Sequence, residues 1–347
     1  MARSNPLQQE HEPHPLRRRM LQAAALGAAA VALPGCASLA GGGSSATGSD
    51  ATAAGTPPRP AAPAWASGTK LVLLGTMAGP VLHPSRAMNS QAIVVDGRIY
   101  LVDCGYGTIG RMTENGLRLP DVADVFITHH HSDHTADYPA FVNLSWILGI
   151  KGTMGIYGPP PMRQVHDAAL AVFAEDTRVR VKATGRQPPQ RSFDVHEVRE
   201  SGLVFQDDRL KVTTTLVDHQ PFEVALAYRF DTSSRAIVIS GDTAPSPALV
   251  ELARGADVLV HEAMLVEQID AMLAKRPYVP PHLKQFLTSG HTTAEDAGRI
   301  AAQAGVKTLV LSHLLPGDEP VPDATWRAAA QKHFKGEVIV GRDGLVI

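Results

Sequence analysis

The segment from His129 to His134 contains four candidate metal ligands in the spacing His-x-His-x-Asp-His. His129, His131, Asp133 and His134 stand where an apolar stretch, 125–128, ends and a helix is predicted to begin. In an extended turn the first two imidazoles point the same way, while Asp133 and His134 reach a neighbouring point from the helix start. Imidazole suits zinc, and a carboxylate beside it suits a second ion with a position open for water. The spacing therefore predicts two metals; a histidine-rich surface loop is the alternative.

The same residues resemble the motif of a known family. His129-x-His131-x-Asp133-His134 resembles the defining motif of the metallo-β-lactamase superfamily, and the resemblance covers roughly residues 71–347. It implies the αββα sandwich of that superfamily, an α/β fold in which two mixed β-sheets are flanked by helices. It also implies a cofactor, two zinc ions per chain.

The resemblance further implies which residues are metal ligands. Three candidates occur singly later in the chain, each after an apolar stretch, as expected for ligands gathered at one sheet edge. A core histidine with its own hydrogen bonds is the alternative for His219 or His313, and a helix N-cap is the alternative for Asp242. The implied ligands are His129, His131 and His219 for one zinc ion, Asp133, His134 and His313 for the other, and Asp242 as a bridge.

A second block narrows the resemblance to one branch. Residues 290–297 resemble the histidine-threonine block of the ribonuclease Z branch, which also includes arylsulfatases and cyclic-nucleotide phosphodiesterases, and residues 261–263 match its His-Glu-Ala element. In that branch the equivalent of His291 lies near the metals and assists the leaving group, so we take His291 and Asp133 as candidate catalytic residues. Glu262 would then orient a ligand or His291. A helix N-cap is the alternative role of the block.

The implied reaction is hydrolysis. Two zinc ions about 3.5–4 Å apart lower the pKa of a shared water, and the resulting hydroxide attacks phosphorus, sulfur or an acyl carbon. A small phosphodiester or aryl sulfate is the favoured substrate, because these are the precedents of the branch. A lactonase, a carboxylic esterase or a β-lactamase-like hydrolase is the alternative within the fold. A non-catalytic metal-binding lipoprotein is the alternative of a different class, and it predicts lost ligands.

Strands and helices are predicted where they would place these residues at one edge. An apolar strand at 71–74 precedes a hairpin around Asp96-Gly97, and a closing strand pair is predicted over 337–347. Hairpins and alternating helix–strand units in both halves predict two sheets covered by helices. Strands are predicted at 93–95, 98–102, 125–128, 193–198, 210–217, 224–230, 236–240, 258–261 and 308–312, and helices at 137–148, 162–174, 247–254 and 293–304.

Charge and composition argue for a globular enzyme without a nucleic-acid partner. The 347 residues are 44% hydrophobic, and 32 basic side chains against 34 acidic ones leave a formal charge of −2. Between Trp146 and His219 there is no long lysine-rich insertion like the arm with which ribonuclease Z grips tRNA, and phosphate contacts need such clusters. The sequence therefore predicts a small-molecule ester substrate. A homodimer stays open, since the branch often forms dimers.

The N-terminal residues are predicted to direct export. Residues 1–36 resemble a signal peptide with a lipobox: Arg17-Arg18-Arg19 precedes an apolar run of about 14 residues that ends at Leu33-Pro34-Gly35-Cys36. We expect a periplasmic protein anchored in the membrane through lipid on Cys36; an ordinary cleaved signal peptide is the alternative, and the twin-arginine route stays open. Residues 37–68 form a predicted flexible linker, and residues 69–347 the catalytic domain.

Overall fold

The computed structural model describes residues 65–276 and 278–347. The predicted signal peptide with Cys36, and the linker as far as residue 64, lie outside the described residues. The first strand begins at Thr69, the residue at which the catalytic domain is predicted to start. Within the described part of the chain, no helix is both long and apolar enough to cross a membrane.

The first half of the domain forms a six-stranded sheet. Its spatial order follows the chain order; β1, β2 and β3 pair antiparallel, and β3 to β6 pair parallel. The predicted hairpin is confirmed, with Val95 paired to Arg98 across its turn. The strands are β1 (Thr69–Gly75), β2 (Ser90–Val95), β3 (Arg98–Val102), β4 (Val122–Phe126), β5 (Met154–Gly158) and β6 (Phe193–Glu197).

The second half forms a seven-stranded sheet. Strands β7 to β10 pair antiparallel, and β10 to β13 pair parallel, so this sheet is mixed as well. The strands are β7 (Gly202–Gln206), β8 (Leu210–Val217), β9 (Ala225–Thr232), β10 (Ala236–Ile239), β11 (Val258–Met264), β12 (Thr308–Leu315) and β13 (Glu337–Val340).

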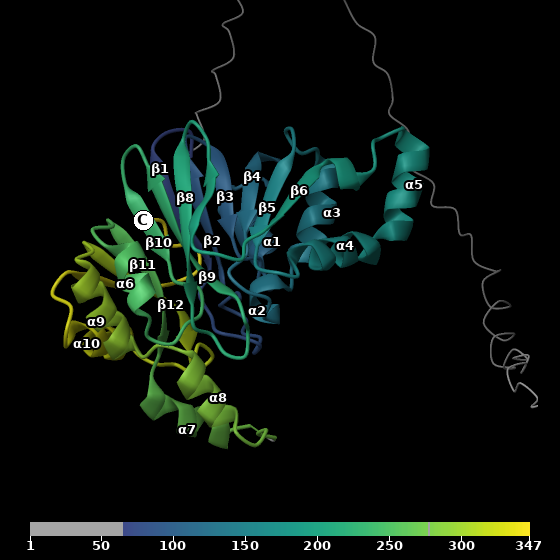
Figure 1. The fold of residues 1–347 in the computed structure, drawn as a ribbon. Helices are drawn as coiled ribbons and strands as arrows, with labels where there is room; N and C mark the ends of the chain where they lie inside the picture. The colour runs from purple at the N-terminus through teal and green to yellow at the C-terminus, as the bar shows by residue number, and fades with distance from the viewer. Residues whose placement is uncertain (1–64, 277) are drawn as a thin grey trace, which may run out of the picture. The chain divides into compact units, whose positions relative to one another are not determined.

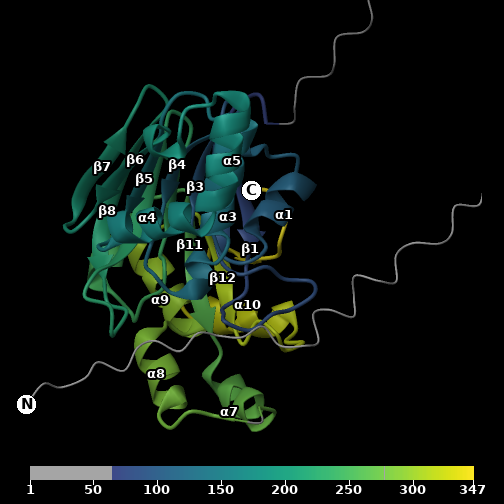
Figure 2. The ribbon, with the colours of Figure 1, turned by 90° about the vertical axis from the view of Figure 1, so that its right-hand side faces the viewer.

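Helices cover the outer faces of the two sheets (Figures 1 and 2). In Figure 1, α3 and α4 lie beside the first sheet and α6, α9 and α10 beside the second, while α7 and α8 project from the end of the sandwich near α2. The helices are α1 (Thr108–Glu114), α2 (Ser132–Thr135), α3 (Tyr138–Leu148), α4 (Met162–Val172), α5 (Ala174–Thr184), α6 (Pro247–Ala253), α7 (Val266–Ala274), α8 (Leu283–Gly290), α9 (Ala294–Ala304) and α10 (Asp323–Gln331).

The alternation of side chains along a strand explains the layers. Leu71 and Leu73 of β1 pack in a cluster with residues of the second sheet, whereas Val72 and Leu74 face the helices of their own half. Because every strand near the centre is buried on both faces, it is a continuous apolar run rather than an alternating one. Each fully buried side chain of this kind contributes about 1.5–3 kcal/mol. The predicted αββα sandwich is therefore the observed architecture.

The predicted strand 125–128 is displaced along the chain: β4 begins three residues earlier, at Val122, and ends two residues earlier. β4 ends at Phe126, because the carbonyl of Thr128 accepts a hydrogen bond from the Leu226 N–H of the other sheet. The chain thus leaves one sheet and approaches the other just before His129.

The predicted C-terminal strand pair is wrong. β13 joins β12 in parallel, and Val346 forms an antiparallel bridge to Val72 of β1. The end of the chain therefore links the two sheets. Local pattern could not show this, because the partners are more than 270 residues apart in sequence.

Candidate metal centre

The four clustered residues are positioned by a turn between β4 and α2. His129 lies in the irregular segment that follows β4, and His131 has the extended φ of −62° and ψ of 149° of the residue that precedes a helix. Asp133 and His134 follow in the first turn of α2. The change from extended to helical backbone sends the two pairs of side chains to two neighbouring points.

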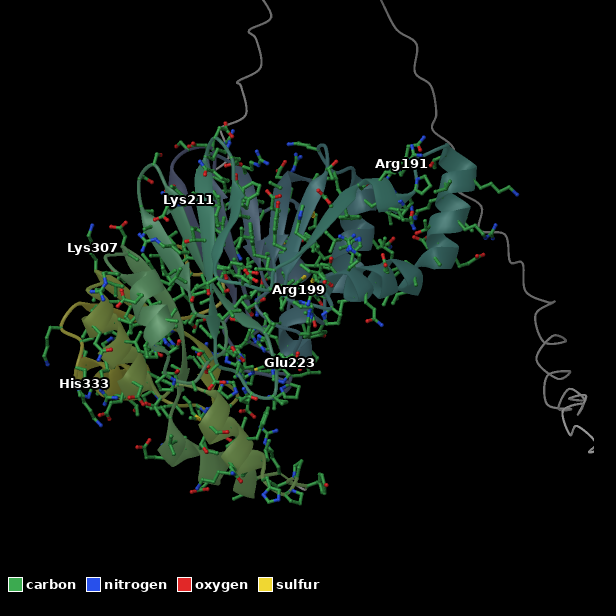
Figure 3. The ribbon with its side chains drawn as sticks, viewed as in Figure 1. Arg191, Arg199, Lys211, Glu223, Lys307 and His333 are labelled. Atoms are coloured by element: carbon green, nitrogen blue, oxygen red, sulfur yellow. The ribbon has the colours of Figure 1, made fainter. Side chains whose placement is uncertain are left out.

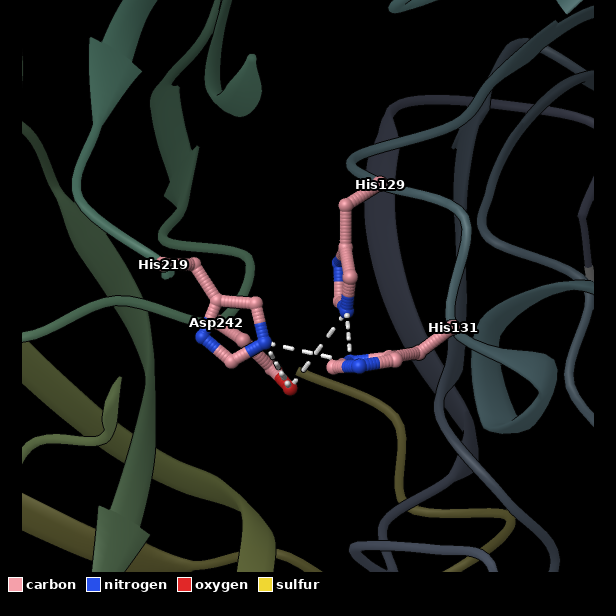
Figure 4. A group of neighbouring side chains, drawn as sticks. All are labelled: His129, His131, His219 and Asp242. Carbon is pink, nitrogen blue, oxygen red and sulfur yellow. Dashed lines mark hydrogen bonds and ion pairs between the residues drawn. The ribbon is translucent and has the colours of Figure 1, made fainter. Parts of the chain in front are cut away.

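Three imidazoles and one carboxylate converge at the first point (Figure 4). His131 Nδ1 lies 3.0 Å from His129 Nε2 and 3.1 Å from His219 Nε2. Asp242 Oδ2 lies 3.7 Å from His129 Nε2 and 3.9 Å from His219 Nε2. Figure 4 shows His129 and His131 approaching from one side, and His219 and Asp242 from the other.

The second point shares the same oxygen of Asp242. Asp242 Oδ2 lies 3.3 Å from both His134 Nε2 and His313 Nε2. Asp133 Oδ2 lies 3.2 Å from His313 Nε2 and 3.8 Å from His134 Nε2. The carboxylate of Asp242 therefore stands between two sets of donor atoms.

These donor sets fit divalent metal ions. Tetrahedral zinc with bonds of about 2.0–2.2 Å separates neighbouring ligand atoms by about 3.2–3.6 Å, and the observed separations scatter around that value. Among the described residues, His134 Nε2 and Asp242 Oδ1 are buried polar atoms without a hydrogen-bond partner. Such orphaned atoms are costly in a folded protein unless something binds them. The two clusters could hold two ions.

In the first donor set, the pKa shifts of two imidazoles and of the shared carboxylate favour the charge states that metal binding requires, whereas the neighbouring carboxylates raise the pKa of His134. Burial lowers the pKa of His131 to about 4, and burial together with the charge of His134 holds the pKa of His129 well below its usual range. Burial alone would raise the pKa of Asp242, but the imidazoles of His313 and His134 hold it well below its usual range. Neutral imidazoles and an ionised carboxylate are the species that coordinate metals.

His219, Asp242 and His313 are supplied by three different strands of the second sheet or by the residues that follow them. His219 lies two residues beyond β8. Asp242 follows β10 through Gly241, whose φ is +60° and where a Cβ would lie 2.7 Å from the Leu226 carbonyl oxygen, so only glycine fits. His313 lies inside β12 rather than beyond the predicted strand end.

A bulge aims His313 at the centre. The register between β11 and β12 shifts by one residue: Glu262 pairs with Ser312 and Ala263 with Leu314, which leaves His313 unpaired. Its φ of +43° is rare for a side chain of this size. Bulges of this kind turn a side chain away from the alternation of its strand.

Outer hydrogen bonds orient two of the imidazoles. His134 Nδ1 lies 2.7 Å from Asp103 Oδ2, and that carboxylate also accepts from the Thr128 hydroxyl and from Asn89 Nδ2. Asp103, which has a φ of +57°, follows β3 and is fully buried. His219 Nδ1–H donates to the Gly290 carbonyl at 2.8 Å. Partners of this kind hold a ligand's ring plane and tautomer.

His291 and Glu262 form a pair beside the donors. His291 Nδ1 lies 2.7 Å from Glu262 Oε2 and 4.0 Å from Asp242 Oδ2. Burial lowers the pKa of His291, but the Glu262 carboxylate outweighs it and the result is a raised pKa of about 9. Glu262 Oε1 accepts from the Thr243 N–H at 2.6 Å, which fixes the carboxylate. The alternative reading of this block holds too, since Thr293 is the N-cap of α9.

Gly79 also supports the centre, although no motif in the sequence indicates it. Its N–H donates to Asp133 Oδ2 at 2.8 Å, and a Cβ there would lie 2.1 Å from the Asp133 Cβ. Glycine is required for this approach, but the segment Met77-Ala78-Gly79-Pro80 has no spacing that marks it. His130, which lies between two of the ligands, is directed elsewhere, with Nε2 2.8 Å from the Pro159 carbonyl oxygen.

The family follows from the fold and this centre. The family description "Beta-lactamase superfamily domain" matches residues 98–314, a span that contains all seven predicted ligands. The chain therefore belongs to the metallo-β-lactamase superfamily of hydrolases, whose fold binds divalent metals, typically zinc.

Its relatives include ribonuclease Z proteins. The chain is 31% identical to ribonuclease Z of Mycobacterium marinum over 79% of this chain and 96% of the relative, and 30% identical to that of Mycobacterium bovis with the same coverage. Among solved structures, the metallo-β-lactamase fold protein YhfI from Bacillus subtilis matches with a TM-score of 0.60 and 20% identity, over 81% of this chain and all of that one.

Human tRNase Z, short form, shares the fold as well. It matches with a TM-score of 0.58 and 23% identity over 80% of this chain and 98% of that one. Together, these relatives and the family membership confirm two predictions, the metallo-β-lactamase fold and a metal-dependent hydrolase acting on ester bonds.

Proposed function

We propose that this protein is a dinuclear zinc phosphodiesterase that acts on a small ester. The observation that carries the proposal is the single oxygen of Asp242 shared by two complete donor sets, with His291 4.0 Å away. In this proposal the zinc ligands are the seven residues named from the sequence: His129, His131, His219, Asp133, His134, His313 and Asp242.

The residues of this chain divide the work of hydrolysis. Two divalent ions held here would supply hydroxide near neutral pH and neutralise charge on a substrate oxygen. The Gly79 N–H donates a hydrogen bond to Asp133 Oδ2 and so holds this carboxylate in the second donor set. His291, kept protonated by Glu262, gives its proton to the departing alkoxide. General acid catalysis of this kind contributes about 10²–10⁴-fold in rate.

Phosphorus is the favoured electrophile because the relatives are nucleases of RNA, whose backbone is a phosphodiester. Aryl sulfate remains the second precedent of the branch. A lactone or another carboxylic ester is the third possibility, because the same hydroxide attacks acyl carbon.

A small substrate is favoured by the distribution of charge. Arg191, Lys211 and Lys307 lie at separate places around the molecule in Figure 3 rather than over one face. On α5, Arg178 and Arg180 are paired with acidic side chains of the same helix. Long nucleic acids need unpaired cations that release counterions. RNA is the second candidate substrate, because the relatives named ribonuclease Z match over almost their full length.

One experiment separates these substrates. The full-length chain is loaded with zinc and assayed with bis(p-nitrophenyl) phosphate, p-nitrophenyl sulfate, p-nitrophenyl acetate and a precursor tRNA, each rate being divided by the uncatalysed rate. We expect about two zinc ions per chain and the largest acceleration for the phosphodiester. With zinc retained, His291→Ala lowers kcat by about 10²-fold or more for a diester that releases an alkoxide, such as a dinucleoside monophosphate. The loss is much smaller for bis(p-nitrophenyl) phosphate, because p-nitrophenolate leaves without a proton. His333→Ala, a change at an exposed histidine, has no effect. If only the precursor tRNA were turned over, the substrate would be RNA rather than a small ester.

We also propose that the protein is exported and anchored through lipid on Cys36. The basic, apolar and lipobox segments of residues 17–36 support this. Palmitate labelling in a bacterial host should be lost in Cys36→Ser and kept in Cys104→Ser, because Cys104 is buried. If the wild-type protein were found unlabelled in the periplasm, the chain would be exported but would carry no lipid anchor.

A further inference from the structure

Two phenylalanines stand against the outermost ligand residue. The Phe222 ring centroid lies 4.6 Å from that of His131, nearly perpendicular to it at 80°. The Phe286 centroid lies 6.2 Å from the same imidazole at 79°. Phe222 also packs on His129 at 5.3 Å and stacks on His219 at 6.0 Å. An aromatic surface therefore borders the first donor set.

Both rings remain accessible to solvent. Phe222 is half-buried, and Phe286 is 36% exposed. His131 is itself the least buried of the first donor set. Accessible aromatic side chains beside a few polar donors are the combination found in small-molecule binding sites, which join apolar walls to a few polar groups.

The position of Phe286 is tied to the centre. Phe286 lies one turn before the end of α8, and the carbonyl of Gly290, the last residue of α8, accepts the His219 hydrogen bond. On its other side α8 packs through Leu287 against a small apolar cluster that includes Met272 of α7. The helix that carries Phe286 is thus held at a fixed place relative to the ligands.

We propose that Phe222 and Phe286 form an aromatic wall that binds a flat unsaturated ring on the ester group that stays on phosphorus. This inference rests on the proposed phosphodiesterase function. The wall contacts His131, whereas the proton donor His291 pairs with Glu262. The departing group faces His291, and the retained group lies along the wall. The ring is either a simple aryl group or a nucleobase.

The test compares diesters with the same leaving group. Methyl, phenyl and thymidine-5′ p-nitrophenyl phosphates all release p-nitrophenolate, so differences in kcat/KM report the retained group. Because planar rings stack on aromatic side chains, we expect Phe286→Ala or Phe222→Ala to lower the phenyl-to-methyl ratio about 5-fold or more, mainly through KM. The ratio of the thymidine ester to the phenyl ester distinguishes a base from an aryl group.

Matched variants separate stacking from other effects. Phe286→Leu keeps an apolar side chain without a flat ring, so we expect an intermediate loss. Leu148→Ala removes an apolar side chain that is 60% exposed on α3, and we expect the ratio to stay at its wild-type value. Zinc content is measured for each variant. If Phe222→Ala loses zinc, the result for Phe286→Ala is the test of the wall, because the Phe286 ring is exposed and its removal leaves no buried cavity.

A binding measurement does not depend on turnover. Calorimetry of the zinc-loaded chain gives the Kd of phenylphosphonate and of methylphosphonate. We expect phenylphosphonate to bind about 10-fold more tightly, and the two variants to bring the ratio towards one. If no ester is turned over but the variants bring the ratio of the two Kd values towards one, the proposed function is wrong and the aromatic wall is supported. If the esters are hydrolysed and neither ratio changes in Phe286→Ala, the wall is overturned.

Discussion

The two sheets contribute to the metal centre in different ways. The first sheet supplies four donors from the six residues between His129 and His134, through one turn from strand to helix. The second sheet supplies His219, Asp242 and His313 from three strands, and the first and last of these residues are 94 positions apart. One half of the centre is thus a local structure, and the other half exists only when β8, β10 and β12 are aligned.

This difference explains where the special backbone lies. The local half has ordinary extended and helical dihedral angles at its ligands. The assembled half needs Gly241 at a φ of +60° and His313 in a bulge at a φ of +43°. Glycine adopts a positive φ freely, but at His313 such a conformation costs about 1–3 kcal/mol and persists only where the surrounding fold over-determines it. Parallel strands end at the same edge of a sheet. The positive φ of Gly241 and the bulge at His313 then bring the ligand side chains to a common point.

The largest expected effect is the loss of the residue that joins the two halves. Asp242→Ala removes the oxygen that lies near both donor sets, so we expect zinc content to fall from about two ions to less than one and kcat to fall by about 10³-fold or more. Metal analysis and the diester assay measure this. Asp208→Ala, at an exposed carboxylate, should leave both unchanged. Full zinc content in Asp242→Ala would contradict the shared bridge.

Gly79→Ala tests the half of the metal centre that the first sheet supplies, because Gly79 lies directly against the Asp133 side chain. The added Cβ would lie 2.1 Å from the Asp133 Cβ, so Asp133 must move and the second donor set must open. We expect affinity for the second zinc ion to fall by about 10-fold or more, measured by competition with a chelator. Gly110→Ala is the matched control, because a Cβ at Gly110 has no atom within 4 Å. Equal affinities in the two variants would count against the role of this contact.

Asp103→Asn tests the support of His134. The amide keeps the shape of the carboxylate but loses its charge, so the His134 imidazole is held less firmly in its tautomer. Loss of such a partner weakens zinc affinity by about 10–100-fold. Activity should return at high zinc concentration, which a disrupted fold would not allow. Activity that stays low at every zinc concentration would contradict a role in metal affinity.

The smallest effect lies at Asp124, on the strand next to Asp103. Burial raises the pKa of Asp124 to about 6, and Arg98 only partly offsets this. A raised carboxyl pKa means that the folded state binds the proton more tightly, so stability falls as pH rises from about 4 to 6. We expect a loss of about 1–3 kcal/mol from this group by pH 7.

Denaturant unfolding of wild type and Asp124→Asn across this pH range measures the effect of Asp124. The variant should lack this part of the pH dependence, because asparagine has no proton to lose. The same dependence in both proteins would mean that another group causes it. A metal-free preparation of each protein removes the contribution of the centre.

The predictable part of the fold and the site was the part encoded in short segments. The His-x-His-x-Asp-His spacing indicated four donors, and the apolar runs of the central strands were found because both their faces are buried. The end of β4, the bulge at His313 and the pairing of Val346 with Val72 were not predictable from local pattern. Each depends on a contact with the other sheet or with a distant strand. The role of Gly79 was not predictable for the same reason, because only its close contact with Asp133 distinguishes it from an ordinary turn glycine.

By itself, the sequence determined the class of chemistry, because residue type and spacing set which atoms can bind a metal and in what order they occur. The tertiary structure decided that one oxygen of Asp242 lies between both donor sets, that Glu262 holds His291 beside them, and that Phe222 and Phe286 lie against His131. Distances between residues far apart in sequence follow from how two sheets pack, and packing is a property of the whole core rather than of any segment.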